Sequence, residues 1–409
     1  MKYILTVIFL AINTLILSPQ VVLTIEGQVI NDSETNISYG YIIPRSQPTL
    51  LTFRNNSLTF VNAFGYMLQA GDETPGLNNN NLDGEVISGN QFFWNGGDES
   101  SWTHAVFTGY NLGVVIKYNY LNNTPNGIQR KSDGMTDVNG VIAYNIIKNP
   151  KVGIVAKGMN GVRIYNNTFY SDKTTSQTGR GLIDIHTNTD DGENAASTGT
   201  KIFNNIFYMK NRILTFKIYE VTCTEGFESD YNIFWCEGGE PLFEIAGSVY
   251  TFSEWQRLGY DQHSVLIDPQ FNNLTDFVPE RRLDYGTNLG IDLMEGLSID
   301  ARWGAESPGT AFQNGRWQVG ARVFSDAEGD ITIWPNPATE TINILLPDLP
   351  LPYQKLKIYD VSGNVVYTSV IEERLNSVTI PKNFATGMYN ISLESPVRDR
   401  FVRKVMIIR

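Results

Sequence analysis

Two lysines occupy matching places in the chain and could act together on an anionic ligand. Segments 127–131 and 153–157 each read Gly-Ile-x-x-Lys, which places Lys131 and Lys157 26 residues apart. Two ammonium groups held close together repel unless an anion lies between them, and each makes its neighbour easier to deprotonate. Removing a proton beside a carboxylate needs a base and a positive charge. We predict Lys157 as the base, with Arg130 or Lys131 neutralising the acid group. The alternative is that these side chains end strands and reach into solvent.

An acidic cluster follows the lysines. It consists of Asp184, Asp190, Asp191 and Glu193. Several carboxylates within one loop suit Ca²⁺, so the cluster predicts a calcium site, although no EF-hand spacing is present. His186 stands inside the same stretch and is a candidate proton donor.

Three more residues are candidates for binding the substrate: His104, Arg180 and Lys217. Residues 111–180 hold nine Lys and Arg against three acids, and residues 181–245 reverse the balance to four against eleven. A basic zone in an acidic protein predicts a local site for a polyanion, and chance scatter of solvated charges is the alternative. Aromatic side chains that could stack on sugar rings, or only pack, are Trp94, Trp102 and Tyr219.

The elements that would position these residues repeat along the chain. Short strand-like runs end in a turn asparagine, and the steps between these asparagines are mostly in the twenties. One step, from Asn167 to Asn205, is 38 residues long and predicts an added loop rather than an extra coil. The asparagines taken as equivalent are Asn62, Asn90, Asn119, Asn145, Asn167, Asn205 and Asn232.

This period predicts a parallel β-solenoid in which each coil supplies about three short strands. Asparagine suits the bend because it tolerates a left-handed backbone and its amide can bond the neighbouring coil, so the stacked asparagines predict a ladder. Leucine-rich repeats are disfavoured because their Leu/Asn consensus is missing, and propellers because their blades need about 40 residues. In such a coil Lys131 and Lys157 stack about 4.8 Å apart at the backbone.

Several stretches carry a resemblance to a known superfamily: the rungs VRIYNNTFY and TKIFNNIFY, the preceding GIVAKG, and the closing DYNIFW and EWQRLGYDQHSVLIDPQF. Over residues 45–325 the chain resembles the right-handed parallel β-helix proteins of the pectate-lyase superfamily. The resemblance implies a substrate-binding floor that includes strands at 104–107, 127–131, 153–157, 181–186 and 213–217. The superfamily holds lyases, glycoside hydrolases, epimerases and proteins without known chemistry, so it specifies fold more than activity.

The same resemblance suggests a hydrolase as an alternative. The NTDDG stretch is similar to the paired acids of polygalacturonase-like hydrolases, but the His-Gly and Arg-Ile-Lys companions of that family are absent. A hydrolase is therefore the third hypothesis. A lyase is the first, and a non-catalytic glycan-binding or adhesive protein is the second.

The composition changes after a linker-like segment at 325–329. Residues 331–409 show alternating strands split by a Ser-Gly-Asn turn, a pattern typical of a small antiparallel sandwich. The motifs PNPATETINI, KIYDVSGNVVY, ATGMYNI and KVMII resemble, in order, the type A C-terminal sorting domain of the type IX secretion system of Bacteroidota. That resemblance implies passage through the Sec system, transport across the outer membrane, and attachment to the surface or release. An ordinary carbohydrate-binding sandwich is the alternative.

The N-terminus predicts an export signal. Lys2, an apolar run over 4–17 and Ser18-Pro19 match a secretory signal peptide over residues 1–20, which leaves 21–325 for the β-helix and its caps. No later apolar run is long enough to span a membrane, so no transmembrane segment is expected in the mature form. Cys223 and Cys236 either pair or stay as free buried thiols, and the few Cys and His residues argue against zinc.

We therefore predict an all-β protein, a right-handed parallel β-helix followed by a small antiparallel β-sandwich, which is secreted or attached to the outer-membrane surface. The expected activity is β-elimination on a uronate-containing or sulfated glycan, with Ca²⁺ as the one expected cofactor. The expected partners are an anionic polysaccharide and the type IX secretion machinery, and a monomer is expected. The net charge of −12 argues against nucleic acid as a partner of an exported protein.

Overall fold

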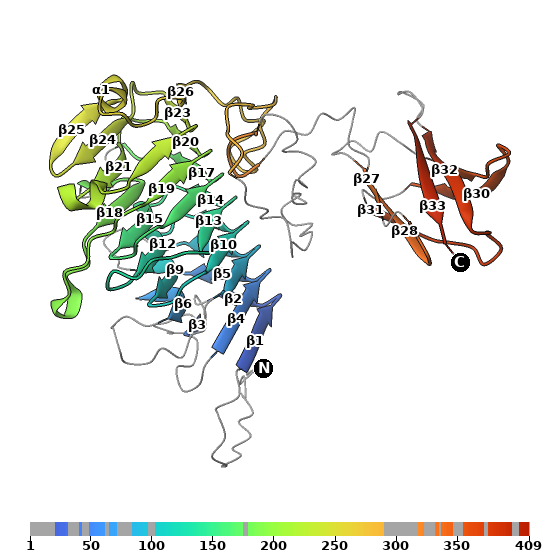
Figure 1. The fold of residues 1–409 in the computed structure, drawn as a ribbon, viewed down its shortest axis with the longest axis horizontal. Helices are drawn as coiled ribbons and strands as arrows, with labels where there is room; N and C mark the ends of the chain where they lie inside the picture. The colour runs from blue at the N-terminus through green and yellow to red at the C-terminus, as the bar shows by residue number, and fades with distance from the viewer. Residues whose placement is uncertain are drawn as a thin grey trace, which may run out of the picture. The chain divides into compact units, whose positions relative to one another are not determined.

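The computed structural model describes residues 21–31, 41–42, 49–61, 65–71, 84–96, 103–174, 179–289, 317–322, 332–334, 337–346, 355–371, 375–394 and 401–408. The predicted signal peptide and the linker-like segment at 325–329 lie outside these ranges. The chain divides into two compact units, Met1–Val323 and Phe324–Arg409, which are drawn in Figure 1. The described residues are mostly β-strand, with parallel sheets in the first unit and antiparallel sheets in the second, as predicted.

The first unit is a coil in which each turn adds one strand to each of three parallel sheets, visible in Figure 1 as strands stacked from blue to yellow. The first sheet contains β1 (Val21–Glu26), β4 (Thr49–Arg54), β7 (Val86–Ser88), β10 (Val115–Lys117), β13 (Val141–Ala143), β16 (Arg163–Tyr165), β19 (Lys201–Phe203) and β22 (Glu228–Asp230). The second contains β2 (Val29–Asn31), β5 (Ser57–Phe60), β8 (Gln91–Trp94), β11 (Tyr120–Asn122), β14 (Ile146–Lys148), β17 (Thr168–Ser171), β20 (Ile206–Met209), β23 (Ile233–Cys236) and β26 (Val265–Leu266).

The third sheet carries the predicted floor strands. It contains β3 (Tyr41–Ile42), β6 (Tyr66–Gly71), β9 (His104–Gly109), β12 (Asn126–Lys131), β15 (Val152–Lys157), β18 (Ile183–His186), β21 (Leu214–Ile218), β24 (Leu242–Ile245) and β25 (Ser248–Thr251). All of its neighbouring strands are parallel except β24 and β25, which pair antiparallel at the C-terminal end of the coil.

An asparagine ladder runs through the turn between the first and second sheets. Each amide oxygen accepts the backbone N–H of the ladder residue one coil earlier at 2.8–3.0 Å and that residue's side-chain amide at 2.9–3.1 Å. Its members are Asn56, Asn90, Asn119, Asn145, Asn167, Asn205 and Asn232.

The predicted ladder is confirmed, with one correction at its start. Asn56, and not Asn62, takes the first position; Asn62 lies outside the described residues. The residue before each ladder asparagine has a left-handed backbone, for example Tyr118 at φ 57° and Asn166 at φ 52°. That bend turns the following amide inward, where it bonds the coils on either side.

Apolar side chains fill the coil from end to end. Phe169, Phe207 and Phe234 are fully buried and stack with ring centroids 4.7 and 5.2 Å apart, one from each of three successive coils. The helix α1 (Phe252–Arg257) closes the C-terminal end of the core with the fully buried Trp255. Cys223 and Cys236 are both buried and unbridged.

A buried carboxylate ends the ladder. Asp261 accepts the Asn232 side-chain amide and the Trp255 indole N–H at 2.9 and 2.8 Å, and the Ser264 hydroxyl at 2.6 Å. Burial raises the pKa of Asp261. Asp261 and Ser264 together take the place of the asparagine of a further coil, because the Ser264 hydroxyl accepts the Asn232 backbone N–H at 2.8 Å while Asp261 accepts the side-chain amide.

The outer face of the second sheet is covered by the chain that follows the coils. Tyr120, Ile146 and Tyr170 pack there against Phe277 and Ala321.

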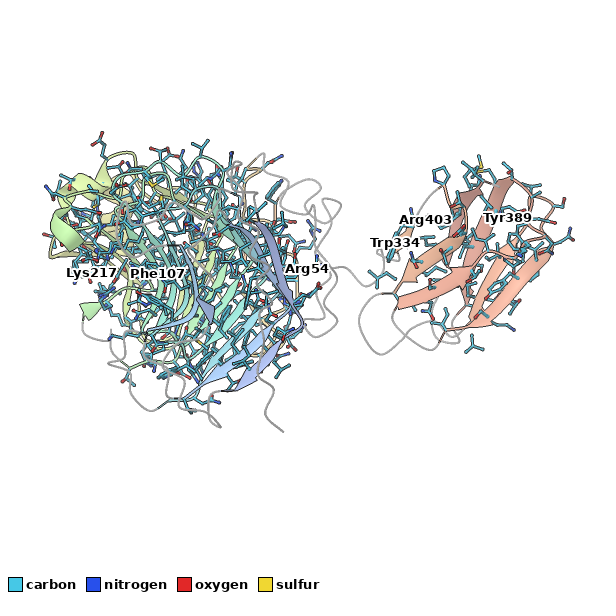
Figure 2. The ribbon with its side chains drawn as sticks, turned by 90° about the horizontal axis from the view of Figure 1, so that it is seen from below. Arg54, Phe107, Lys217, Trp334, Tyr389 and Arg403 are labelled. Atoms are coloured by element: carbon cyan, nitrogen blue, oxygen red, sulfur yellow. The ribbon has the colours of Figure 1, made fainter. Side chains whose placement is uncertain are left out.

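The second unit is an antiparallel sandwich. One sheet contains β27 (Thr332–Trp334), β28 (Thr341–Leu345) and β31 (Leu375–Thr379), and the other contains β29 (Lys355–Tyr359), β30 (Val365–Val370), β32 (Gly387–Glu394) and β33 (Phe401–Ile407). Buried side chains from both sheets, including Ile344, Ile358 and Ile391, form one core. Tyr389 and Arg403 mark this unit in Figure 2.

Candidate functional site

Three ionisable side chains stack at the ends of adjacent strands in the third sheet. Lys131 on β12 is the register partner of Lys157 on β15, which in turn is the partner of His186 on β18. The predicted stacking of the two lysines is therefore confirmed. Their positions follow from the pleat, because buried Ile128, Ile154 and similar residues face the core while the alternate residues face outward.

An acid from the chain itself lies between the two lysines. Asp190 Oδ2 is 2.9 Å from Lys131 Nζ and 2.6 Å from Lys157 Nζ. Burial alone would raise the pKa of Asp190, but hydrogen bonds from the two lysines hold it below its usual value. The anion that the sequence predicts between two stacked ammonium groups is thus supplied by the loop after β18.

This loop, residues 187–198, is called the return loop because it folds back over earlier coils. The Asn188 side-chain amide donates to the Ser132 carbonyl at 2.9 Å, at the end of β12. The Tyr110 hydroxyl, just after β9, donates to Glu193 Oε1 at 2.8 Å, and burial together with that carboxylate raises the pKa of Tyr110. The long step predicted from Asn167 to Asn205 is therefore a loop that reaches the lysine pair.

Arg130 does not lie with the lysines, which corrects its predicted role. Its side chain is 1% exposed and faces the interior of the coil, since neighbouring residues of a strand face opposite sides. Its guanidinium pairs with Asp137 at 2.7 Å and donates to the Thr108 hydroxyl at 2.8 Å. Arg130 is satisfied inside the fold and cannot neutralise a ligand on the outer face.

Asp184 and Arg180 form a buried ion pair one strand further along. Arg180 Nε donates to Asp184 Oδ2, and the Gly181 N–H donates to Asp184 Oδ1 at 2.8 Å. Burial raises the pKa of Asp184 to about 6, against the lowering effect of Arg180. The Tyr219 hydroxyl lies 3.4 Å from Asp184 Oδ2, and burial and that carboxylate raise the pKa of Tyr219.

His186 lies between the lysine pair and this group. Its ring centroid is 5.2 Å from that of Tyr219, and its Nδ1 is 3.2 Å from the Thr187 carbonyl oxygen. Burial, with help from Lys157 and Arg180, lowers the pKa of His186 to about 4. The imidazole is therefore neutral at neutral pH and has a nitrogen lone pair to offer.

Lys217 joins the same region, whereas His104 does not. Lys217 Nζ is 3.1 Å from Glu244 Oε1, 4.6 Å from the centroid of the Tyr219 ring, and donates to the Gly179 carbonyl at 2.8 Å. His104 stands at the start of β9, where it is 7% exposed and its Nε2 is 2.7 Å from Gln129 Oε1. Lys217 on β21 and Phe107 on β9 mark the third sheet in Figure 2.

Three of the four acids proposed for Ca²⁺ have described side chains, and each of these three has a different partner. Asp184 pairs with Arg180, Asp190 pairs with the two lysines, and Glu193 accepts the Tyr110 hydroxyl. The Asp191 side chain lies outside the described residues. Within the ranges that the structure describes, no three His, Cys, Asp or Glu side chains gather closely enough to hold a metal ion. Calcium binding at these acids stays a prediction.

The aromatic candidates also separate. Trp94 is 5% exposed and belongs to the core, and Trp102 lies outside the described residues. Tyr219 is the one that lies in the site. Its contact with His186 and the contacts of Asp190 with the lysines were not predicted, because they join residues at least 33 positions apart through loop and coil geometry.

The fold and the site together define a parallel β-helix with an ionisable cluster on its third sheet. Residues 332–408 match the family described as the secretion system C-terminal sorting domain. This type IX sorting domain means that the protein is secreted or attached to the cell surface. No curated protein and no solved structure matches the chain. The resemblance of the β-helix to the pectate-lyase superfamily therefore stays a prediction. No helix in the described part of the chain is long and apolar enough to cross a membrane.

Proposed function

We propose that the β-helix is a polysaccharide lyase that cleaves a uronate-containing or sulfated anionic glycan by β-elimination. The observation that carries the proposal is the stack of Lys131, Lys157 and His186 on three successive coils. It combines two cations with a neutral imidazole, and both kinds of group are needed when a proton is removed beside a carboxylate.

The cations supply the binding. Lys131 and Lys157 reach the outer face with side chains 6% and 18% exposed, and Arg180 and Lys217 follow at 25% and 17%. Partial burial strengthens their attraction for an anion, because the surroundings have a lower effective dielectric constant than water. A glycan lying across the strands would place successive acidic groups near successive coils, about 4.8 Å apart.

The base in this proposal is His186 rather than Lys157. Lys157 Nζ donates to Asp190 at 2.6 Å and is thereby engaged with a carboxylate, whereas burial lowers the pKa of His186 to about 4 and leaves its imidazole neutral at neutral pH. The imidazole takes the proton from the carbon beside the carboxylate. The electrons of that C–H bond form a C=C bond to the next carbon, and the bond from that carbon to the glycosidic oxygen breaks. Tyr219, whose raised pKa keeps its phenol protonated, gives the leaving oxygen a proton.

The lysines stabilise the charge that develops on the carboxylate during proton removal. A fixed cation at this place lowers the barrier without having to reorganise, which is the strongest contribution that a protein makes to many reactions. No step of this mechanism passes through a metal ion.

The test is incubation of the full-length mature protein with alginate, pectin, glycosaminoglycan and ulvan. Elimination leaves an unsaturated sugar at the new chain end, so ultraviolet absorbance should rise with one or more of these substrates. Binding of a polyanion without any unsaturated product would contradict the lyase.

Such a result would favour the second candidate, a non-catalytic glycan-binding protein. One observation supports that candidate: Asp190 holds both lysines in an ion-paired state, which suits a site that binds anions and does no chemistry. A hydrolase is favoured less, because Asp190, one of the two acids in the NTDDG stretch, pairs with two lysines.

A further inference from the structure

The lysine pair is already occupied by a carboxylate, and the two sides of this contact differ in exposure. The side chains of Lys131 and Lys157 are 6% and 18% exposed, whereas that of Asp190 is 42% exposed. The fold therefore holds the cations in place, and the anion approaches them from the solvent side. An acid with this exposure can leave its partners and be solvated at little cost.

The return loop has anchors that do not involve Asp190. The Thr198 backbone N–H donates to Asn160 Oδ1, just after β15, at 3.0 Å, and the Asn188 side chain donates to the Ser132 carbonyl at 2.9 Å. Glu193 accepts the Tyr110 hydroxyl at 2.8 Å. These bonds hold the loop across three coils whether or not Asp190 touches the lysines.

We propose that Asp190 competes with the glycan for the lysine pair. Its carboxylate occupies the position between Lys131 and Lys157 where a uronate carboxylate would bind, so a glycan binds by displacing it. The identity of the glycan rests on the proposed function. The uronate carboxylate replaces that of Asp190 at the same two ammonium groups, and the Asp190 side chain becomes solvated.

The cost of displacing Asp190 is the same for every oligouronate, so only a chain with enough further contacts to offset that cost binds well. A single uronate gains only the contacts with the two lysines that Asp190 gives up, because each of them presents one carboxylate to the same cations. A longer chain adds contacts with Arg180, Lys217 and Tyr219, which lie on the following coils. Those added contacts make displacement favourable, because Asp190 has no counterpart to them.

The test compares binding of oligouronates of increasing length by the full-length mature protein and its Asp190→Asn variant, using calorimetry. If the Asp190-bound state is populated about nine times in ten, removing it lowers the apparent Kd by about tenfold. The fold-gain should be similar for all oligouronates that bind between the two lysines, because each must displace the same Asp190-bound state. Combining Asp190→Asn with Lys131→Gln should cancel it, because the gain acts through the lysine pair.

Asp133→Asn is the matched control. Asp133 is exposed and lies two residues beyond Lys131, so this change removes the same charge near the same site. It should alter the Kd by less than about twofold. An Asp190→Asn protein that binds no tighter than the wild type, or that melts well below it, overturns the proposal.

The outcomes separate this inference from the proposed function. Tighter binding by Asp190→Asn without unsaturated product supports the competitor and contradicts the lyase. Cleavage by the wild type with unchanged binding by Asp190→Asn supports the lyase and contradicts the competitor. If neither protein binds any uronate polymer, both are wrong.

Discussion

Lys131 and Lys157 are register partners on adjacent strands, and their ammonium groups bind the same oxygen of Asp190. Two unit charges 4 Å apart repel by about 1 kcal/mol in water and by about 4 kcal/mol at the effective dielectric constant near a protein surface. The parallel register imposes this repulsion, and an anion between the ammonium groups relieves it. The pair therefore favours an anion between its two ammonium groups, and Asp190 supplies one.

The first prediction assigns the base. His186→Gln should lower kcat/KM for elimination by about 10²-fold or more, because it removes the lone pair that takes the proton. Lys157→Arg should keep most of the activity, because a guanidinium keeps the charge, whereas Lys157→Ala should not. The measurement is the rate of increase in ultraviolet absorbance.

His263→Gln is the control for that experiment, since His263 is 62% exposed and pairs with Asp230 in the C-terminal cap. If Lys157→Arg is as inactive as Lys157→Ala while His186→Gln still cleaves, the base is Lys157, as the sequence alone predicts.

The second prediction concerns the ladder. Asn167→Ala removes the acceptor of the Asn145 backbone N–H and the donor to the Ile142 carbonyl, at 3.0 and 2.9 Å. Leaving such buried groups unpaired should cost roughly 1–3 kcal/mol of unfolding free energy. Chemical denaturation measures this cost. Asn139→Ala, at an exposed position, should change stability little. Equal melting of both variants and the wild type would show that the ladder contributes nothing.

The third prediction concerns pH and Asp184. Its folded pKa of about 6 lies above the usual 3.8, so the folded state binds the proton more tightly. The contribution of Asp184 to the free energy of unfolding is fully present below about pH 4 and is lost as the pH rises through about 6. Asp184→Asn should abolish this loss in denaturation midpoints measured from pH 4 to 7.

His186 should act with the opposite sign. Its folded pKa of about 4 lies below the usual 6.5. The contribution of His186 to the free energy of unfolding is therefore present above about pH 6.5 and is lost as the pH falls through about 4. His186→Gln should therefore leave a protein whose stability falls from pH 4 to 6, whereas Asp184→Asn leaves one whose stability rises. Slopes of the same sign in the two variants would contradict both assignments.

The fourth prediction concerns export. Deleting residues 405–409 removes Val405 and Ile407, which are fully buried in the sandwich core, and shortens the pairing of β33 with β32. The sorting domain should then fail to fold or be recognised, and the protein should stay in the periplasm. Cell fractionation with a surface protease measures the distribution.

A matched pair of substitutions refines that test. Val405→Asp places a charge in the core and should block export, whereas Val402→Asp falls on a residue that is 49% exposed on the same strand and should be tolerated. If the deletion variant or Val405→Asp reaches the cell surface in the same amount as the wild type, the intact β33 is not required for export.

The sequence by itself determined the coil, the ladder, the register of the two lysines and the sorting domain. The coil, the ladder and the register depend on local periodicity, because a coil of fixed length places residues 26 apart directly above one another, as Lys131 and Lys157 show. The sorting domain was recognised from the order of its motifs. Strand alternation could also have excluded Arg130 from the outer face, because it is the immediate neighbour of Lys131.

Only the tertiary structure decided how the site is assembled. Asp190 reaches the lysines through a loop whose path does not follow the repeat. Tyr219, just after β21, contacts His186 at the end of β18, and the return loop lies between these two strands in the sequence. The pKa of His186 depends on burial and on Lys157 and Arg180, which come from other strands or loops. Periodicity predicts which residues stack, but a loop is free of the repeat, and the burial and charge around each group depend on where that loop folds.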